Sequence, residues 1–132
     1  MKVAQKVFLV DDDPAIRASL KFSFELEGFE VVEFADAETI AEHAPSLGGG
    51  CLVIDYRLPG MNGLALLALL RMQGVTLPAV VITSNPTRQV RQAVADAKAV
   101  LIEKPLLCDA LTAAIRSLIS STEMSLPVDL TQ

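Results

Sequence analysis

Short apolar runs alternate with longer amphipathic stretches five times along the chain. Each run has the length of a buried strand, and in the stretch that follows it apolar residues recur every three or four positions, as on one face of a helix. This alternation predicts an α/β fold, a (βα)5 domain with a doubly wound parallel sheet and right-handed crossovers. The predicted strands are 7–10, 29–34, 51–54, 79–82 and 100–102, and the predicted helices are 14–27, 36–44, 63–73, 87–97 and 108–120.

Residues with strong positional preferences mark the ends of these elements. Asp13 precedes Pro14, which predicts a helix N-cap followed by proline at the first helical position. Gly28 is expected to end the same helix. Strand 29–34 alternates between apolar and polar residues more than the other strands do. We therefore expect it at an edge of the sheet, with one side facing water.

Composition narrows the class of protein. The chain has 132 residues, of which 52% are hydrophobic, enough for one soluble domain with a substantial core. Its formal charge of −5 argues against binding to nucleic acid or to an anionic membrane surface. Cys51 and Cys108 lie far apart without a neighbouring histidine, so we expect reduced thiols and not a metal site or a disulfide. No signal peptide or membrane-spanning stretch is recognisable, and we expect a cytoplasmic protein.

Four of the predicted strands end in side chains that can bind ions or phosphate groups. These side chains are Asp11 and Asp12 after the first strand, Asp55 after the third, Thr83 after the fourth and Lys104 after the fifth. The carboxyl ends of parallel strands lie at one edge of the sheet, where open α/β sheets bind ligands. We therefore expect these five side chains to converge.

Three carboxylates and one ammonium group give this set a net charge of −2. Like charges so close raise one another's pKa unless a counter-ion neutralises them. A divalent cation brings the sum to zero, and Mg²⁺ suits one or two carboxylates together with waters and a phosphate group. The Thr83 hydroxyl and the Lys104 ammonium are the donors that a phosphoryl group requires. The set is therefore suited to placing a phosphoryl group on Asp55.

Four motifs in this order resemble the receiver domain of response regulators in two-component signalling. They are Val10–Pro14 (VDDDP), Ile54–Gly63 (IDYRLPGMNG), Ile82–Thr83 and Glu103–Pro105 (EKP). The resemblance covers about residues 6–120 and implies a flavodoxin-like fold with strand order 2-1-3-4-5. We expect a receiver domain over residues 1–120, followed by a short polar tail over 121–132 without an output domain.

The resemblance also implies a role for each site residue. Asp55 would accept a phosphoryl group from a sensor histidine kinase or a histidine phosphotransfer protein. Asp12, Asp55 and the backbone carbonyl of Arg57 would bind Mg²⁺ directly, and Asp11 would act through a metal-bound water. Thr83 and Lys104 would hold phosphoryl oxygens, and the Lys104–Pro105 peptide bond is expected to be cis. Such a protein is a phosphoacceptor that catalyses its own phosphorylation and dephosphorylation, not a conventional enzyme.

Four positions bear on rate and output. Arg57 and Asn85 lie two residues beyond Asp55 and Thr83, and we hypothesise that they tune the lifetime of the phosphorylated form. Thr83 is expected to move toward the phosphoryl group as part of the switch. Receivers usually have Tyr or Phe three residues before the lysine, and Leu101 occupies that position here. Leucine has no ring to turn inward, so either the usual output persists on a more buried strand or the readout is altered.

The resemblance places the output surface on the fourth helix, the fifth strand and the fifth helix. Its expected partner is a downstream protein or a second copy of the chain, without direct binding to nucleic acid or membrane. Two interpretations of the chain remain open at this point: a complete single-domain regulator, and a receiver excised from a transcription factor.

Other function classes fit less well. The intact Asp12, Asp55, Thr83 and Lys104 argue against a receiver-like module that binds partners without phosphorylation, but Leu101 keeps this alternative open. An aspartyl-nucleophile phosphohydrolase would need a second acid two residues after Asp55, where Arg57 stands. A flavin-nucleotide binder would need a phosphate loop after the first strand, and the three consecutive aspartates there would repel the phosphate.

Overall fold

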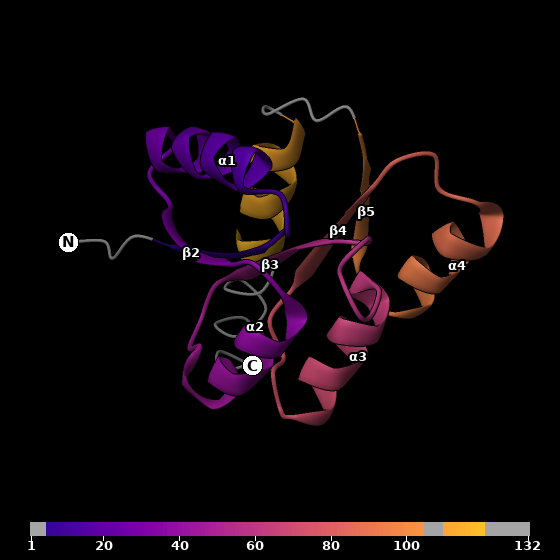
Figure 1. Cartoon of the computed structure of the whole chain (residues 1–132). Helices are drawn as coiled ribbons and strands as arrows, with labels where there is room; N and C mark the ends of the chain where they lie inside the picture. The colour runs from indigo at the N-terminus through magenta and orange to yellow at the C-terminus, as the bar shows by residue number, and fades with distance from the viewer. Residues whose placement is uncertain (1–4, 105–109, 121–132) are drawn as a thin grey trace, which may run out of the picture.

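A five-stranded parallel sheet with helices on both faces forms the protein (Figure 1). The computed structural model describes residues 5–104 and 110–120. The strands are β1 (Lys6–Val10), β2 (Glu30–Phe34), β3 (Cys51–Asp55), β4 (Ala79–Thr83) and β5 (Val100–Glu103). The helices are α1 (Pro14–Leu26), α2 (Ala37–His43), the 3₁₀ helix η1 (Ala44–Ser46), α3 (Gly63–Met72) and α4 (Arg88–Asp96), and residues 110–120 are also helical. The strand order β2-β1-β3-β4-β5 confirms the predicted 2-1-3-4-5 topology.

Two apolar cores lie on opposite faces of this sheet. One contains Leu20 and Phe24 from α1 together with Leu111 and Ile115 from the segment 110–120. The other contains side chains from α2 and α3, among them Ile40, Leu66, Leu67 and Leu70. The central strand β3 is buried along its whole length because helices cover both of its faces.

The predicted caps are confirmed. The Asp13 carboxylate accepts hydrogen bonds from the backbone N–H groups of Ala15 and Ile16, which starts α1. Gly28, with φ of +95°, follows the end of the helix, in the left-handed region that glycine adopts without strain. One boundary differs from the prediction: after α2 the chain continues through Pro45 as η1. A 3₁₀ turn tolerates proline in its first positions because the N–H groups there have no helical partner.

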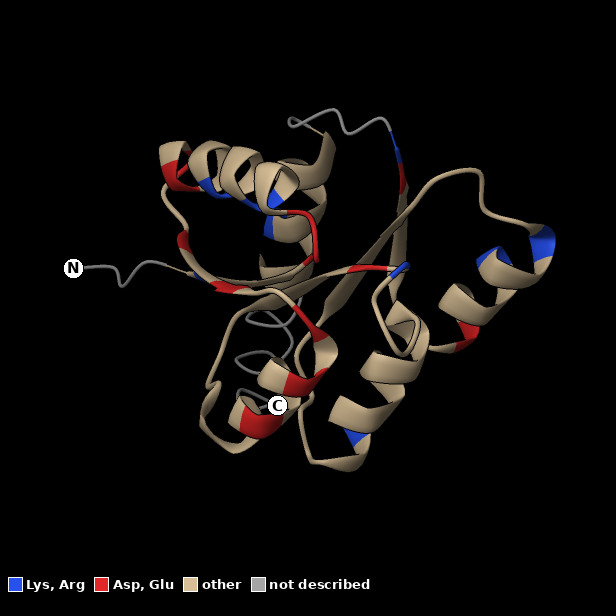
Figure 2. Ribbon diagram, in the orientation of Figure 1, with Lys and Arg blue, Asp and Glu red and all other residues tan. Residues whose placement is uncertain are grey.

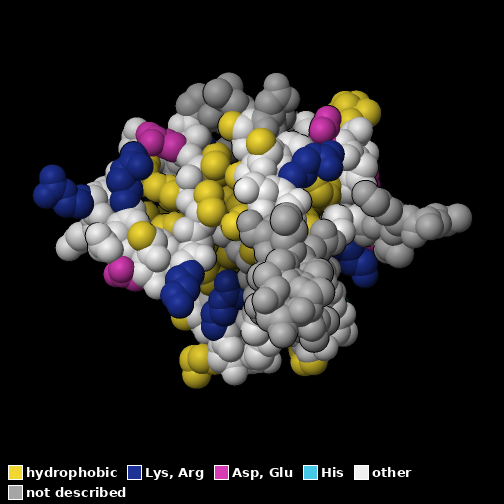
Figure 3. All heavy atoms as spheres, turned by 180° about the vertical axis from the view of Figure 1, so that it is seen from behind, with side chains coloured by type: hydrophobic (Ala, Val, Ile, Leu, Met, Phe, Trp, Pro, Cys, Tyr) yellow, Lys and Arg dark blue, Asp and Glu magenta, His cyan; other side chains and the backbone are white. Residues whose placement is uncertain are grey.

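The two edge strands are less buried than the centre. β2 is an edge strand, as its alternating sequence predicts, and its burial alternates less regularly than the sequence does. On β5, the residues Val100, Leu101 and Ile102 are only half-buried. Figure 3, which shows the molecule from behind, shows hydrophobic side chains gathered near the middle of this face. The β5 side of the sheet therefore retains apolar surface.

The connection from β3 to α3 brings the helix start unusually close to the end of the strand. The Asn62 side chain caps α3 by accepting from the N–H of Ala65, and the Gly63 N–H donates to the Tyr56 carbonyl at 2.7 Å. A Cβ atom on Gly63 would lie 2.6 Å from the Asp55 carbonyl oxygen and 2.9 Å from Cγ2 of Ile54. Only glycine therefore fits here without moving the backbone of β3.

The described residues test only part of the predictions about the cysteines and about membrane-spanning segments. Cys51 is a free, fully buried cysteine, and burial raises the pKa of its thiol to about 12. Cys108 and the tail 121–132 lie outside the described residues. Across residues 5–104 and 110–120, none of the helices combines the length and the hydrophobicity needed to cross a bilayer.

Candidate functional site

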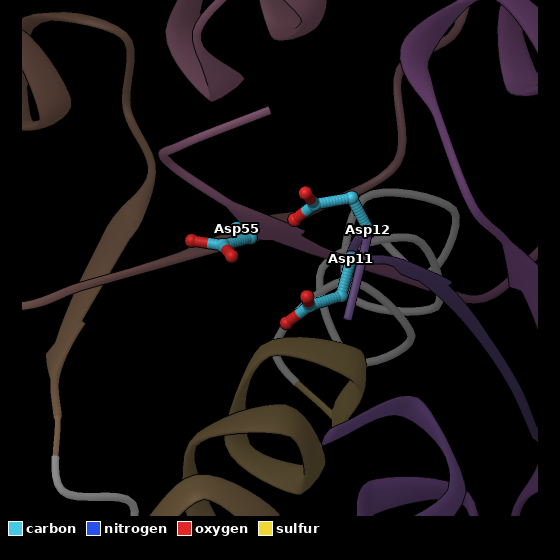
Figure 4. Close-up of side chains that lie close together, drawn as sticks. All are labelled: Asp11, Asp12 and Asp55. Carbon is cyan, nitrogen blue, oxygen red and sulfur yellow. The ribbon is translucent and has the colours of Figure 1, made fainter. Parts of the chain in front are cut away.

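Three aspartates meet at the carboxyl ends of β1 and β3. The two strands are parallel neighbours, with Val10 opposite Ile54, so the residues that follow them lie side by side. One carboxylate oxygen from each of Asp11, Asp12 and Asp55 lies within 4.8 Å of the other two. Figure 4 shows their side chains projecting to the same side from the two strand ends. The predicted convergence of these three residues is confirmed.

Asp11 and Asp13 hold the turn after β1 by backbone contacts. The Asp11 N–H donates to the Phe34 carbonyl at 3.2 Å, and an Asp11 carboxylate oxygen accepts from the Asp13 N–H at 2.9 Å. Asp13 is in turn fixed as the cap of α1. Asp11 is 2% exposed, whereas Asp12 between them has an exposed side chain. The acidic residues of this loop (red in Figure 2) therefore divide into one buried group, one exposed group and one helix cap.

Asp55, at the end of β3, is a buried carboxylate, with 6% of its surface exposed. One of its oxygens accepts from the Arg57 N–H at 3.2 Å. The other lies 3.6 Å from Nζ of Lys104, within the range of an ion pair. The Lys104 backbone N–H donates to the Thr83 carbonyl at 2.8 Å, which ties the end of β5 to the end of β4. The predicted approach of Lys104 to Asp55 is confirmed.

The surroundings of Asp11 disfavour the ionised form of its carboxyl group. Burial is the main cause that raises the pKa of Asp11, and the carboxylates of Asp55 and Asp12 raise it further. The Asp13 N–H and the Lys104 ammonium lower this pKa and only partly offset the increase. Three clustered carboxylates are hard oxygen donors, and a small divalent cation such as Mg²⁺ prefers such ligands. The donor set therefore fits Mg²⁺.

Asp11→Asn is expected to stabilise the metal-free protein modestly at neutral pH. The folded state holds the Asp11 proton more tightly than the unfolded state, so ionising this carboxyl group costs stability as pH rises through its folded pKa. Asparagine removes that cost and can still accept the Asp13 N–H. The gain should disappear in acid below the ordinary pKa of 3.8, where Asp11 is protonated in both states. Denaturant unfolding in chelator at neutral and acidic pH measures it.

Asp36→Asn provides a control of opposite sign. Hydrogen bonds from the Thr39 side chain and then from its backbone lower the pKa of Asp36. Its ionised form therefore stabilises the folded state above the ordinary pKa, and this stabilisation is lost as pH falls. A stabilising effect of Asp36→Asn at neutral pH, or a destabilising one of Asp11→Asn, would contradict this description of the site.

Of the remaining predicted residues, Thr83 and Asn85 lie at the same edge of the sheet, and Leu101 lies within β5. Thr83 is 3% exposed, and its hydroxyl donates weakly to the Ser84 carbonyl, at 3.4 Å. Asn85 is exposed and adopts a left-handed backbone with φ of 43°. Leu101 is half-buried on β5, opposite Val81. The Lys104–Pro105 peptide bond, predicted to be cis, extends outside the described residues.

Arg17 is a residue of this site that the sequence pattern did not identify. One nitrogen of its guanidinium group donates to the Asp11 backbone carbonyl at 2.7 Å. Arg17 stands one helical turn after the cap Asp13, so its side chain can reach back over the acidic turn. A basic residue at that spacing after three aspartates is the signal that could have identified it.

Comparison with known proteins places these features in one family. The family model described as "Response regulator receiver domain" matches residues 7–116. The transcriptional regulatory protein FixJ of Bradyrhizobium diazoefficiens is 36% identical over 118 residues. The C4-dicarboxylate transport transcriptional regulatory protein DctD of Rhizobium meliloti is 33% identical over 117 residues. A CheY-like receiver domain protein from Methanospirillum hungatei has the same fold, with a TM-score of 0.86 and 25% identity.

Each match covers most of this chain, but the share of the relative that is covered differs widely. The FixJ match covers 89% of this chain and 58% of FixJ, and the DctD match covers 88% of this chain and 25% of DctD. The Methanospirillum hungatei structure aligns over 93% of this chain and 99% of its own. The chain thus spans about half or less of these curated relatives, and about the whole of a solved receiver.

Proposed function

Since the chain belongs to the response regulator receiver family, we propose that it is a phospho-accepting signalling switch in which Asp55 takes the phosphoryl group. Receivers are signalling proteins and not conventional enzymes. The donor would be a sensor histidine kinase or a histidine phosphotransfer protein in the cytoplasm. One observation supports this role above the others: the enclosed Asp55 carboxylate lies 3.6 Å from the Lys104 ammonium and shares a 4.8 Å cluster with Asp11 and Asp12.

The proposed reaction exchanges one bond to phosphorus for another. The bond from phosphorus to the donor's histidine nitrogen breaks, and a bond from phosphorus to an Asp55 carboxylate oxygen forms. Asp55 must therefore be ionised and aimed at phosphorus, and the hydrogen bond from the Arg57 N–H holds its carboxylate in one orientation. Reset follows when water attacks phosphorus, the bond to Asp55 breaks, and inorganic phosphate leaves.

Asp12, Asp55 and the Arg57 carbonyl would bind Mg²⁺, and Asp11 would hold one of its waters. The ion would screen the negative charge of the incoming phosphoryl group. The Lys104 ammonium would hold one phosphoryl oxygen by a charge-assisted hydrogen bond. The Thr83 hydroxyl would leave the Ser84 carbonyl, a weak acceptor at 3.4 Å, for another phosphoryl oxygen. This exchange supplies the movement of the switch, because a buried hydroxyl gains a charged partner.

Arg57 and Asn85 are proposed to set how fast water resets the switch. Arg57 follows Asp55 by two positions, and Asn85 follows Thr83 by two. Asn85 is exposed and has a left-handed backbone conformation, which is uncommon for residues other than glycine. Their side chains would border the line along which water approaches phosphorus. The hydrolysis rate of the phosphorylated protein is the measurement that tests this role.

The test of the proposed function is phosphorylation by a small donor. Incubation with acetyl phosphate and Mg²⁺ is expected to add one phosphoryl group to the intact mass, and peptide mapping should place it on Asp55. Excess chelator should prevent the gain, since the carboxylates then have no counter-ion to admit another anion. An unchanged mass with acetyl phosphate and with a phosphorylated histidine donor would refute the proposal, and a gain mapped elsewhere would do so too.

The output surface is proposed to lie on α4, β5 and the helical residues 110–120. Arg91 of α4 pairs with Glu103 of β5 at 2.9 Å, and the preceding β5 residues 100–102 are only half-buried. Leu101 lies in this region and would transmit the Thr83 movement by repacking, without an aromatic ring. The partner would be a downstream protein or a second copy of the chain. If the chain is part of a longer protein, as the matched segment of FixJ is, the output segment that it controls would lie in the same polypeptide.

A further inference from the structure

The Arg17 side chain joins three elements of the protein beside the acidic cluster. Its Nη1 donates to the Asp11 backbone carbonyl at 2.7 Å, and its Nε donates to the Glu33 carboxylate on β2 at 3.3 Å. The Arg17 backbone N–H also donates to the Asp13 carbonyl at 3.0 Å, as part of the first turn of α1. The side chain is 18% exposed; its contact with Asp11 is partly buried, and its contact with Glu33 lies at the surface.

The contact with Asp11 acts on the peptide unit between two carboxylates. The Asp11 carbonyl belongs to the planar peptide that links Asp11 to Asp12. The N–H on the other side of Asp11 is held by the Phe34 carbonyl. Because the peptides on both sides of Asp11 are held, the backbone orientation at the start of Asp12 is fixed as well. The Asp12 side chain itself is exposed, so its aim depends on this backbone.

We propose that Arg17 is a positioning residue for metal binding, which holds the peptide between Asp11 and Asp12 so that both carboxylates face Asp55. This inference rests on the proposed function, in which those carboxylates bind Mg²⁺. Arg17 touches neither the metal nor the phosphoryl group. It acts by keeping the acidic turn in its binding conformation before the ion arrives, so that the ion does not have to order it.

Lys21 is a basic residue of α1 that also pairs with Glu33 but has no described contact with the acidic turn. It lies one turn further along α1, and its Nζ is 3.5 Å from the other oxygen of Glu33. Both cations therefore join α1 to β2 through one carboxylate, and of the two only Arg17 shows a contact with the acidic turn among the described residues. A residue that merely attaches the helix to the sheet would affect the protein as Lys21 does. Lys21→Ala is thus a matched control for Arg17→Ala.

The experiment is a titration of the full chain with MgCl₂, followed by amide NMR shifts, for wild type, Arg17→Ala, Arg17→Lys and Lys21→Ala. Arg17→Ala is expected to weaken Mg²⁺ binding by roughly 10-fold to 100-fold, the usual effect of removing a group that orients metal ligands. Lys21→Ala should bind Mg²⁺ as wild type does. Arg17→Lys should fall between them, because an ammonium group does not reproduce the two directed donors of a guanidinium. Thermal unfolding in chelator measures the structural contribution of each side chain separately.

Several results would overturn the inference. Arg17→Ala that loses stability in chelator but binds Mg²⁺ like wild type would make Arg17 a structural residue only. Equal losses of Mg²⁺ affinity in Arg17→Ala and Lys21→Ala would have the same meaning. If Arg17→Ala fails to fold, the comparison of Arg17→Lys with Lys21→Ala decides by the same criteria. Wild type that binds Mg²⁺ but takes no phosphoryl group would refute the proposed function and leave the role of Arg17 to the titration.

Discussion

Asp55→Asn is expected to abolish phosphorylation by acetyl phosphate completely. The amide nitrogen and oxygen of asparagine are too weak as nucleophiles to attack phosphorus, and Asp55 is the carboxylate of the described cluster that pairs with Lys104. The amide oxygen of an asparagine at this position can still accept the Arg57 N–H, so the loop conformation should persist. Removing one of three clustered charges also relieves repulsion, so the metal-free variant should be at least as stable as wild type. Intact mass and denaturant unfolding measure the two effects.

Asp13→Asn is the matched control for this substitution. It makes the same chemical change two residues beyond the buried Asp11, where the side chain caps α1. Asparagine caps helices about as well as aspartate does, so both stability and phosphorylation should be retained. Undiminished phosphorylation of Asp55→Asn, or its loss in Asp13→Asn, would show that the acceptor has been assigned to the wrong aspartate.

Gly63→Ala is expected to cause the largest loss of stability among conservative changes in this part of the chain, about 3 kcal/mol. The added Cβ would lie 2.6 Å from the Asp55 carbonyl oxygen, a backbone atom of a fully buried strand that has no room to move. Relief requires α3 to shift away from the sheet, which opens the core around Leu66 and Leu67. Because the opposing atom belongs to Asp55, phosphorylation should also slow. Denaturant unfolding and the rate of mass gain measure both.

Gly49→Ala is the control for backbone effects of replacing glycine. A Cβ atom at Gly49 meets nothing within 4 Å, and its backbone has no positive φ. Its replacement should be neutral or slightly stabilising, because alanine restricts the unfolded chain. Equal stabilities of Gly63→Ala and Gly49→Ala would mean that the approach of α3 to β3 is looser than described.

The sequence predicts the strands and their site residues well because both depend on local patterns. Five apolar runs became five strands within about one residue, and the polar residues that follow them met at one edge, as parallel pairing requires. Caps such as Asp13 and Asn62 are set by contacts within one turn, so they too can be predicted from sequence.

Features that depend on distant contacts could not be predicted. The spacing of Arg17 after the three aspartates hints at its contact with the acidic turn, but its bond to Glu33 exists only because β2 lies beside β1, which no local pattern reveals. The tight fit at Gly63 depends on how closely α3 approaches the end of β3. Side-chain direction is also unpredictable from spacing: Thr83 lies at the expected strand end, and yet its hydroxyl donates to Ser84.

Tyr56, whose carbonyl accepts the Gly63 N–H, is the only tyrosine of a chain without tryptophan. Its own N–H donates to the Ile82 carbonyl on β4, so the backbone of this residue is held between β4 and the start of α3, directly after Asp55. The tyrosine fluorescence of the whole protein therefore comes from one ring, on the residue covalently adjacent to the proposed acceptor. We therefore expect ion binding and phosphorylation to change the fluorescence of the unlabelled protein through this one residue, which follows Asp55 directly in the chain.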